Sequence, residues 1–190
     1  DSTNNRIVVA VRNANDSNHG YAMVGSLSGT TVTWGSATEF NNNNSNEMGI
    51  SFDSTAEKVV ISYRDYGNSS YGTAIVGTVS GTSISFGTAV VFNSGTTTKT
   101  RPCYDSTNNR TVISYGDGED GSANGMAVVG TVSGTGISFG SEVEFESGAI
   151  SDSGLAFDSD TGKVVIAYRQ NHETSGETDF KRGTAVVGTV

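Results

Sequence analysis

The sequence has one cysteine, one proline and no long apolar run. The lone Cys103 excludes a disulfide within the chain and any cysteine-based metal site. No stretch approaches the roughly 20 apolar residues that a membrane-spanning helix needs, so we expect no membrane insertion. Positive charge is scarce, since 11 Lys and Arg stand against 20 Asp and Glu and give a net charge of −9. This deficit argues against a nucleic-acid partner, because phosphate binding needs a basic surface.

Helical signals are absent as well. No segment carries apolar residues at the spacing of an amphipathic helix. Short runs rich in Val, Ile, Thr, Tyr and Phe alternate instead with turns rich in Gly, Asn and Ser, and the chain holds 25 glycines. These features predict an all-β protein.

The sequence repeats itself along its whole length. Asp-Ser-Thr begins at residues 1, 53 and 105 and Asp-Ser-Asp at 158, which gives spacings of 52, 52 and 53 residues. The glycine of a Val-Gly-Thr or Val-Gly-Ser motif recurs at residues 25, 77, 130 and 188. Two anchors with one period predict a single repeat array over residues 1–190, with units at roughly 1–46, 47–98, 99–150 and 151–190.

Each unit is predicted to contain four short strands, called A to D in chain order. In the second unit these strands are expected at residues 47–52, 58–65, 72–79 and 83–92. A four-stranded unit of about 40–50 residues is typical of a β-propeller blade, whose sheet buries both faces against neighbouring blades. A β-solenoid is the alternative, although its coils usually need only about 20–30 residues.

The first and last units are incomplete in this register. The first lacks strand A and the last lacks strand D, so roughly three and a half to four blades are present. These two ends cannot complete each other within one blade. We therefore expect the chain to be a window of a longer propeller, with self-assembly as another way to complete the ring.

The connections between strands fall into two classes. The A–B turns carry an Asp that can bond its own backbone two residues on, and the C–D turns carry Ser-Gly-Thr; both hardly change among units. The B–C and D–A connections differ in every unit, and in a propeller they emerge together on one face. Loops on a rigid framework commonly carry binding, so this face is the predicted binding surface. The alternative is that these loops vary because nothing constrains them.

A group of polar and aromatic residues recurs where strand B ends. An aromatic ring beside an arginine and a carboxylate suits a sugar or carboxylate ligand. The alternative is a structural Arg–Asp pair between blades. The candidate ligand-binding residues are Arg12, Asn13, Tyr63, Arg64, Asp65, Tyr115, Asp117, Tyr168 and Arg169.

Two residues that occur once are assigned to the core. Cys103 lies in a predicted strand and is interpreted as a small buried hydrophobe rather than a nucleophile. Trp34 takes the place that Phe86 and Phe139 hold in the next two units, so it is also expected to be buried.

Metal and catalytic chemistry have weaker support. The histidines stand alone in variable loops and the loop acids follow no calcium-binding pattern, as for His19, His172, Asp16, Glu119 and Asp120. No metal and no cofactor are therefore predicted. No pair of catalytic carboxylates and no Ser-His-Asp set can be singled out, so we do not expect an enzyme.

The stretches DSTNN, VVISYRD, GTAIVGTVSGTSISFG and VVFNSG together resemble tandem propeller repeats of marine bacteriophage and marine metagenomic proteins. The resemblance covers the whole chain, although the third unit has YGD where the second has YRD. It implies a virion-associated or cell-surface binding role, such as a tail-fibre module, and an extracellular or virion-surface location. It implies no catalytic residues.

The sequence thus predicts a non-catalytic binding or adhesion module. Its expected partner is a surface glycan or a protein receptor, bound through the variable loops on one face. A purely structural scaffold is one alternative. A propeller glycosidase of the sialidase type is the other, although the Ser, Asp and Gly of a sialidase Asp-box are absent at the required spacing before Thr33-Trp34.

Overall fold

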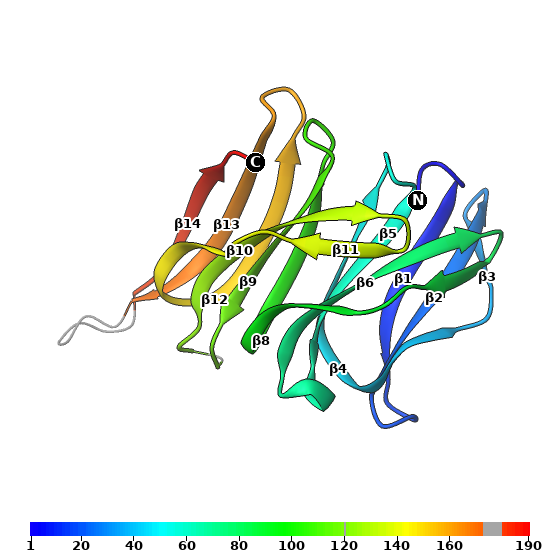
Figure 1. Ribbon diagram of the computed structural model, residues 1–190, viewed down its shortest axis with the longest axis horizontal. Coiled ribbons are helices and arrows are strands. Elements are labelled where there is room, and N and C mark those ends of the chain that lie inside the picture. The colour runs from blue at the N-terminus through cyan, green and yellow to red at the C-terminus, as the bar shows by residue number, and fades with distance from the viewer. Residues whose placement is uncertain (120, 173–179) are drawn as a thin grey trace.

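Strands make up almost all of the ordered secondary structure (Figure 1). The computed structural model describes residues 1–119, 121–172 and 180–190, without the side chains of residues 172, 180 and 181. Within these residues it has 14 strands, one short 3-10 helix and no α-helix. The expectation of an all-β chain is confirmed. No helix in the described part is long and apolar enough to cross a bilayer.

The strands follow one another at short intervals along the chain. They are β1 (Arg6–Asn13), β2 (His19–Ser28), β3 (Thr31–Trp34), β4 (Thr38–Asp53), β5 (Lys58–Asp65), β6 (Tyr71–Ser80), β7 (Ser83–Phe86), β8 (Val90–Asp105), β9 (Arg110–Asp117), β10 (Asn124–Ser133), β11 (Gly136–Phe139), β12 (Val143–Asp158), β13 (Lys163–His172) and β14 (Phe180–Gly188). The 3-10 helix η1 (Tyr66–Asn68) lies between β5 and β6.

All neighbouring strands are antiparallel and form one open sheet of 14 strands. Its hydrogen-bonded path runs β1-β2-β4-β5-β6-β8-β9-β10-β12-β13-β14, while β3, β7 and β11 pair with β2, β6 and β10 beside that path. The path ends at β1 and β14 rather than closing into a barrel. An open sheet of this kind also fits a solenoid-like or sandwich arrangement.

Three long strands carry the chain from one repeat to the next. The first part of β4 pairs with β2 as far as Asn44, and from Ser45 onward the strand pairs with β5. β8 and β12 make the same change of partner. The register shifts after Asn46, and Glu47 has a φ of 51°, so a bulge turns the backbone from one repeat into the next without a loop. The short strands expected at 47–52, 100–104 and 153–157 are therefore the second halves of 16-residue strands.

Strand D of the second repeat is divided, although one strand was expected over residues 83–92. The structure has β7, a break at residues 87–89, and then β8. The break begins at Gly87, where a Cβ atom would lie 1.9 Å from the carbonyl oxygen of Thr135 in the next repeat. The same break recurs at residues 140–142, so it belongs to the repeat, and at Gly87 it coincides with a close approach of two backbones that only glycine allows.

Side chains of each central strand alternate between two apolar layers. In β5, Val59, Ile61 and Tyr63 pack toward the first repeat, whereas Val60 packs toward the third. A ring pair recurs in each layer, and its centroids lie 5.2 Å apart for Phe40 and Tyr63. Consecutive repeats therefore stack face to face through a shared core.

The two residues assigned to the core from sequence lie elsewhere. Trp34 is 42% exposed, which contradicts the expectation of a buried ring. Phe86 and Phe139 are each covered by the repeat that precedes them in the structure. Trp34 belongs to the first repeat, so its ring has no such cover within the described residues. Cys103 is a free thiol and only half-buried. Burial still raises its pKa, so it is a poor nucleophile.

Candidate functional site

The variable connections of successive repeats gather at one end of the stacked strands. In Figure 1 the β1–β2 connection and η1 lie at the bottom, and the β8–β9 and β12–β13 turns lie at the top. Each B–C connection touches the D–A crossing beside it, since Ser45 N donates to Asn18 O at 3.0 Å and Thr97 N donates to Ser70 O at 3.0 Å. We call this end the loop end.

The opposite end is built from the invariant turns. Asp53 Oδ1 accepts from the backbone N of Thr55 at 3.0 Å, which confirms the expected Asx-type turn. Neighbouring turns are tied together, because Thr55 Oγ1 donates to Asn109 Oδ1 at 2.8 Å and Tyr104 Oη donates to Thr55 at 2.7 Å. The polar groups of neighbouring turns thus hydrogen-bond to one another, and these bonds explain why the turns are similar among repeats.

The three tyrosines predicted to bind ligand belong to the core. Tyr63 and Tyr115 are 1% and 0% exposed, and Tyr168 is 7% exposed. Each ring packs on a phenylalanine of the preceding repeat. Burial raises the pKa of all three phenols. These rings therefore offer no open aromatic face to a ligand.

Two predicted carboxylates hold neighbouring repeats together. Asp65 Oδ1 accepts from Asn41 Nδ2 at 3.1 Å and from the backbone N of Gly67 at 3.0 Å, which also caps η1. Asp117 Oδ1 accepts in the same way from Asn93 Nδ2 at 2.9 Å. Their recurrence at the end of strand B follows from this packing between repeats.

The predicted arginines differ from one repeat to another. Arg64 is only 7% exposed, and its guanidinium lies 4.5 Å from the centre of the Tyr66 ring and 3.6 Å from Glu119 Oε2. Arg169 instead pairs with Asp152 at 3.1 Å and hydrogen-bonds Ser151. The nine predicted residues are thus spread over four repeats rather than gathered around one ligand.

The first repeat has the most open of the predicted positions. Arg12 is exposed, and Asn13 Oδ1 accepts from the backbone N of Asn15 at 3.1 Å. Tyr66 was not among the predicted residues, yet it is 42% exposed at the loop end. Its only sequence signal was an aromatic residue in a variable loop.

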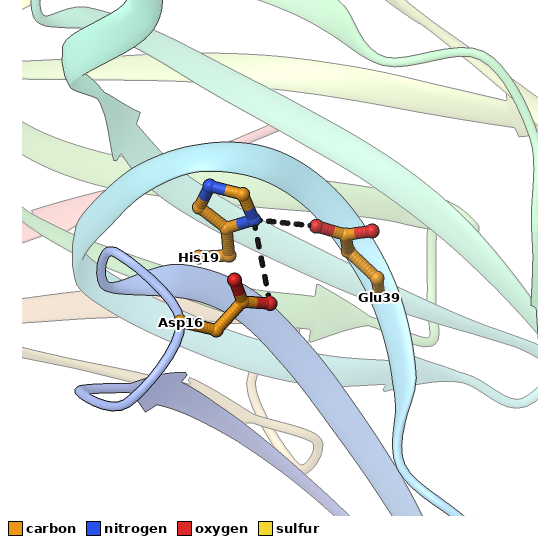
Figure 2. A group of neighbouring side chains, drawn as sticks. All are labelled: Asp16, His19 and Glu39. Atoms are coloured by element: carbon orange, nitrogen blue, oxygen red, sulfur yellow. Dashed lines mark hydrogen bonds and ion pairs between the residues drawn. The ribbon is translucent and has the colours of Figure 1, made fainter.

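A histidine and two carboxylates meet at the loop end of the first repeat (Figure 2). His19 Nδ1 lies 2.7 Å from Glu39 Oε1 and 3.6 Å from Asp16 Oδ2. Asp16 lies in the β1–β2 connection, His19 begins β2, and Glu39 lies in β4. We call these residues the histidine–carboxylate cluster, and they are the group in the described part that could hold a metal ion.

Tyr21 supports the cluster from one side. Its hydroxyl donates to Asp16 Oδ2 at 2.5 Å, and this bond raises the pKa of Tyr21 to about 12. From sequence His19 was expected to stand alone, because Glu39 is 20 residues away and comes close only through the pairing of β2 with β4. Of the other loop acids considered for metal binding, Glu119 contacts Arg64, and Asp120 lies outside the described residues, as does the His172 side chain.

Comparison with known proteins leaves function to be argued from the chain itself. No protein-family model matches the sequence, and no curated protein matches it. The resemblance to bacteriophage repeats stays a prediction.

Proposed function

We propose that this protein is a non-catalytic binding module whose loop end recognises a surface glycan or a receptor. One observation carries the proposal: the connections that differ among repeats lie side by side at one end, while the invariant turns lie at the other. Backbone bonds such as Ser45 N to Asn18 O and Thr97 N to Ser70 O hold the described connections on a rigid framework, which is where binding loops commonly lie.

The side chains at the loop end suit a polar, uncharged ligand such as a carbohydrate. Tyr66 presents an exposed ring, and the Arg64 guanidinium lies 4.5 Å from its centre. This contact orders the ring before a ligand binds. Asn42 and Asn43 lie exposed in the neighbouring D–A crossing and offer amide donors and acceptors. Tyr, Asn, Ser and Gly together resemble the composition of adaptable recognition loops.

A catalytic role has less support. General acid–base catalysis by a glycosidase needs two carboxyl groups flanking one bond of the substrate. The recurrent carboxylates Asp65 and Asp117 already accept hydrogen bonds from asparagines of the preceding repeat. We therefore propose binding without hydrolysis, at a cell or virion surface as the bacteriophage resemblance implies.

We further propose that the repeats are blades of a β-propeller. Each complete repeat contributes four antiparallel strands, and consecutive repeats share an apolar layer with a recurring tyrosine–phenylalanine pair. Small-angle scattering tests this arrangement. A propeller, or an assembly that completes one, gives a flat disc, whereas a solenoid gives a rod that lengthens along the stack.

The binding proposal is tested with a glycan array and with intact cells. The test variant carries Tyr66→Ala and Asn68→Ala at the loop end. The matched control carries Ser28→Ala at the exposed end of β2 and Thr30→Ala in the exposed turn to β3. That turn lies at the other end of a ten-residue strand, roughly 30 Å from the loop end at about 3.4 Å per residue.

We expect the original protein and the control to bind the same glycans and the loop variant to lose them. Unchanged binding by the loop variant would place binding elsewhere on the molecule. Binding to no glycan and no cell would overturn the proposal in favour of a structural scaffold. Release of sugar from a bound glycan would instead favour a glycosidase.

A further inference from the structure

The histidine–carboxylate cluster is not required by the repeat fold. At the same positions of the second repeat, 52 residues on, the chain has Asn68, Tyr71 and Val91. The third repeat has Asn124 and Glu144 at the histidine and glutamate positions, joined by a 3.2 Å hydrogen bond. The same strands and connections therefore form without the cluster.

The loop of the first repeat is held in place by other bonds. Asn18 O accepts from Ser45 N at 3.0 Å, and the second repeat makes the same bond between Ser70 and Thr97. Because this backbone bond already fixes the connection, the two acids need not approach a histidine to shape the loop. Their convergence points to a role other than folding.

The distances within the cluster suit a small cation. Tetrahedral ligands about 2.0–2.1 Å from a zinc ion lie about 3.3 Å from one another. His19 Nδ1 and Asp16 Oδ2 are 3.6 Å apart, close to that value. His19 Nδ1 and Glu39 Oε1 are 2.7 Å apart, so they need to separate by only a few tenths of an ångström as their hydrogen bond gives way to two metal bonds.

The surroundings favour an ion with an open coordination position. The His19 side chain is 21% exposed, and those of Asp16 and Glu39 are 44% and 39% exposed, so water reaches the site. Apart from His19, the structure gives neither carboxylate an ion-pair partner among the described residues. Tyr21 fixes the Asp16 carboxylate from outside, as the outer partners of metal ligands commonly do.

The residue opposite His19 on the next strand has a side-chain oxygen without a partner. Asn44 is the residue that pairs with His19 across β2 and β4. Its Oδ1 atom is buried and accepts no hydrogen bond within the described part of the chain. Buried acceptors are nearly always satisfied, so this oxygen is free to accept from a group outside the described chain.

We propose that Asp16, His19 and Glu39 bind a zinc ion at the loop end of the first repeat. Three ligands from a histidine and two carboxylates leave the fourth position to water, as in open zinc sites. The imidazole nitrogen selects zinc over calcium, which takes oxygen ligands. This site is independent of whether the loop end binds glycans.

Isothermal titration of the chelator-treated, full chain with zinc chloride at pH 7.5 tests the proposal. The test variants take their residues from the second repeat, which folds with them: Asp16→Asn, His19→Tyr and Glu39→Val. The matched controls are His172→Ala, which removes the other histidine, and Glu144→Gln, which changes the equivalent glutamate of the third repeat. Circular dichroism confirms that each variant is folded.

We expect one zinc ion per chain, unchanged affinity in both controls, and a loss of more than about 100-fold in His19→Tyr, since even outer partners of a metal cost about 10–100-fold. Zinc should also raise the melting temperature of the original protein and not that of His19→Tyr. The proposal is overturned if the original protein binds no zinc, if it binds calcium alone, if folded His19→Tyr binds as tightly, or if His172→Ala loses the ion.

Discussion

Asn41 donates a hydrogen bond from its side-chain amide to the carboxylate of Asp65, at 3.1 Å, across the boundary between the first two repeats. The bond joins β4 to the end of β5, and its equivalent recurs 52 residues on. Asp65, which the sequence predicted to bind ligand, thus connects two neighbouring repeats. The carboxylate also accepts from a backbone N–H of η1, so one side chain fixes both the interface and the loop.

Replacement of Asp65 by alanine should destabilise the protein. The change removes the acceptor for Asn41 Nδ2 and for Gly67 N, and Asp65 is only 9% exposed. Hydrogen bonds to a charged group contribute about 1.5–3 kcal/mol each, so we expect a loss of about 2–4 kcal/mol in the free energy of unfolding. Urea denaturation followed by fluorescence measures it.

Asp65→Asn serves as the control for that experiment. It keeps an oxygen that can accept from the backbone of η1 but loses the charge, so about half of the loss is expected. If Asp65→Ala were as stable as the original protein, the inference that Asp65 stabilises the contact between repeats would be wrong.

Tyr63 should affect stability and not ligand binding. Its ring packs on Phe40 between repeats with 5.2 Å between centroids. Tyr63→Ala should cost about 3–5 kcal/mol, as truncation of a buried aromatic ring does. Tyr63→Phe keeps the ring, and any ligand found for the loop end should bind it unchanged. A loss of binding in a stable Tyr63→Phe variant would restore this residue to the binding site.

Gly87 and Gly140 occupy the same position of successive repeats but should respond differently to alanine. A Cβ at Gly87 would lie 1.9 Å from the carbonyl oxygen of Thr135, whereas at Gly140 its nearest neighbour would be Val129 O at 3.8 Å. We expect Gly87→Ala to cost about 1–3 kcal/mol, as overpacking does, and Gly140→Ala to cost little. Because both changes remove the same freedom from the unfolded chain, the difference in melting temperature isolates the contact. Equal effects would show that the repeats do not touch there.

Much of this fold follows from sequence because the repeat provides its own comparison. The strand expected at 58–65 is the observed β5, and the Asx-type turn at Asp53 forms as its residues indicate. The fusion of strand D into the next strand A could not be read from composition. It depends on a bulge with positive φ at Glu47, a residue without the usual preference for that conformation.

The candidate site was less predictable for a different reason. Residues that recur at the end of strand B in each repeat could recur because they bind a ligand or because they pack between repeats. The burial of Tyr63 and Tyr115 favours packing. The histidine–carboxylate cluster does not recur, so a search for repeated residues passes over it. Only strand pairing brings Glu39 to His19.

Stability should fall above about pH 10, where free tyrosine ionises. Burial raises the pKa of Tyr63, Tyr115 and Tyr168 in the folded chain above that value. Between the two pKa values the folded state holds more protons than the unfolded state, so the free energy of unfolding declines as the pH rises. The three tyrosines contribute fully to the free energy of unfolding below about pH 10. This contribution is lost as the pH rises toward their pKa values in the folded protein.

Urea denaturation at intervals from pH 8 to 11.5 measures this decline, and absorbance at 295 nm reports tyrosinate. The steepest expected slope is about 1.4 kcal/mol per pH unit for each fully buried phenol. Tyr63→Phe removes one such group while keeping its ring, so its slope should be shallower by about that amount. A free energy of unfolding that stays constant through pH 11, or an unchanged slope in Tyr63→Phe, would mean that these phenols ionise in place and that water reaches the layers between repeats.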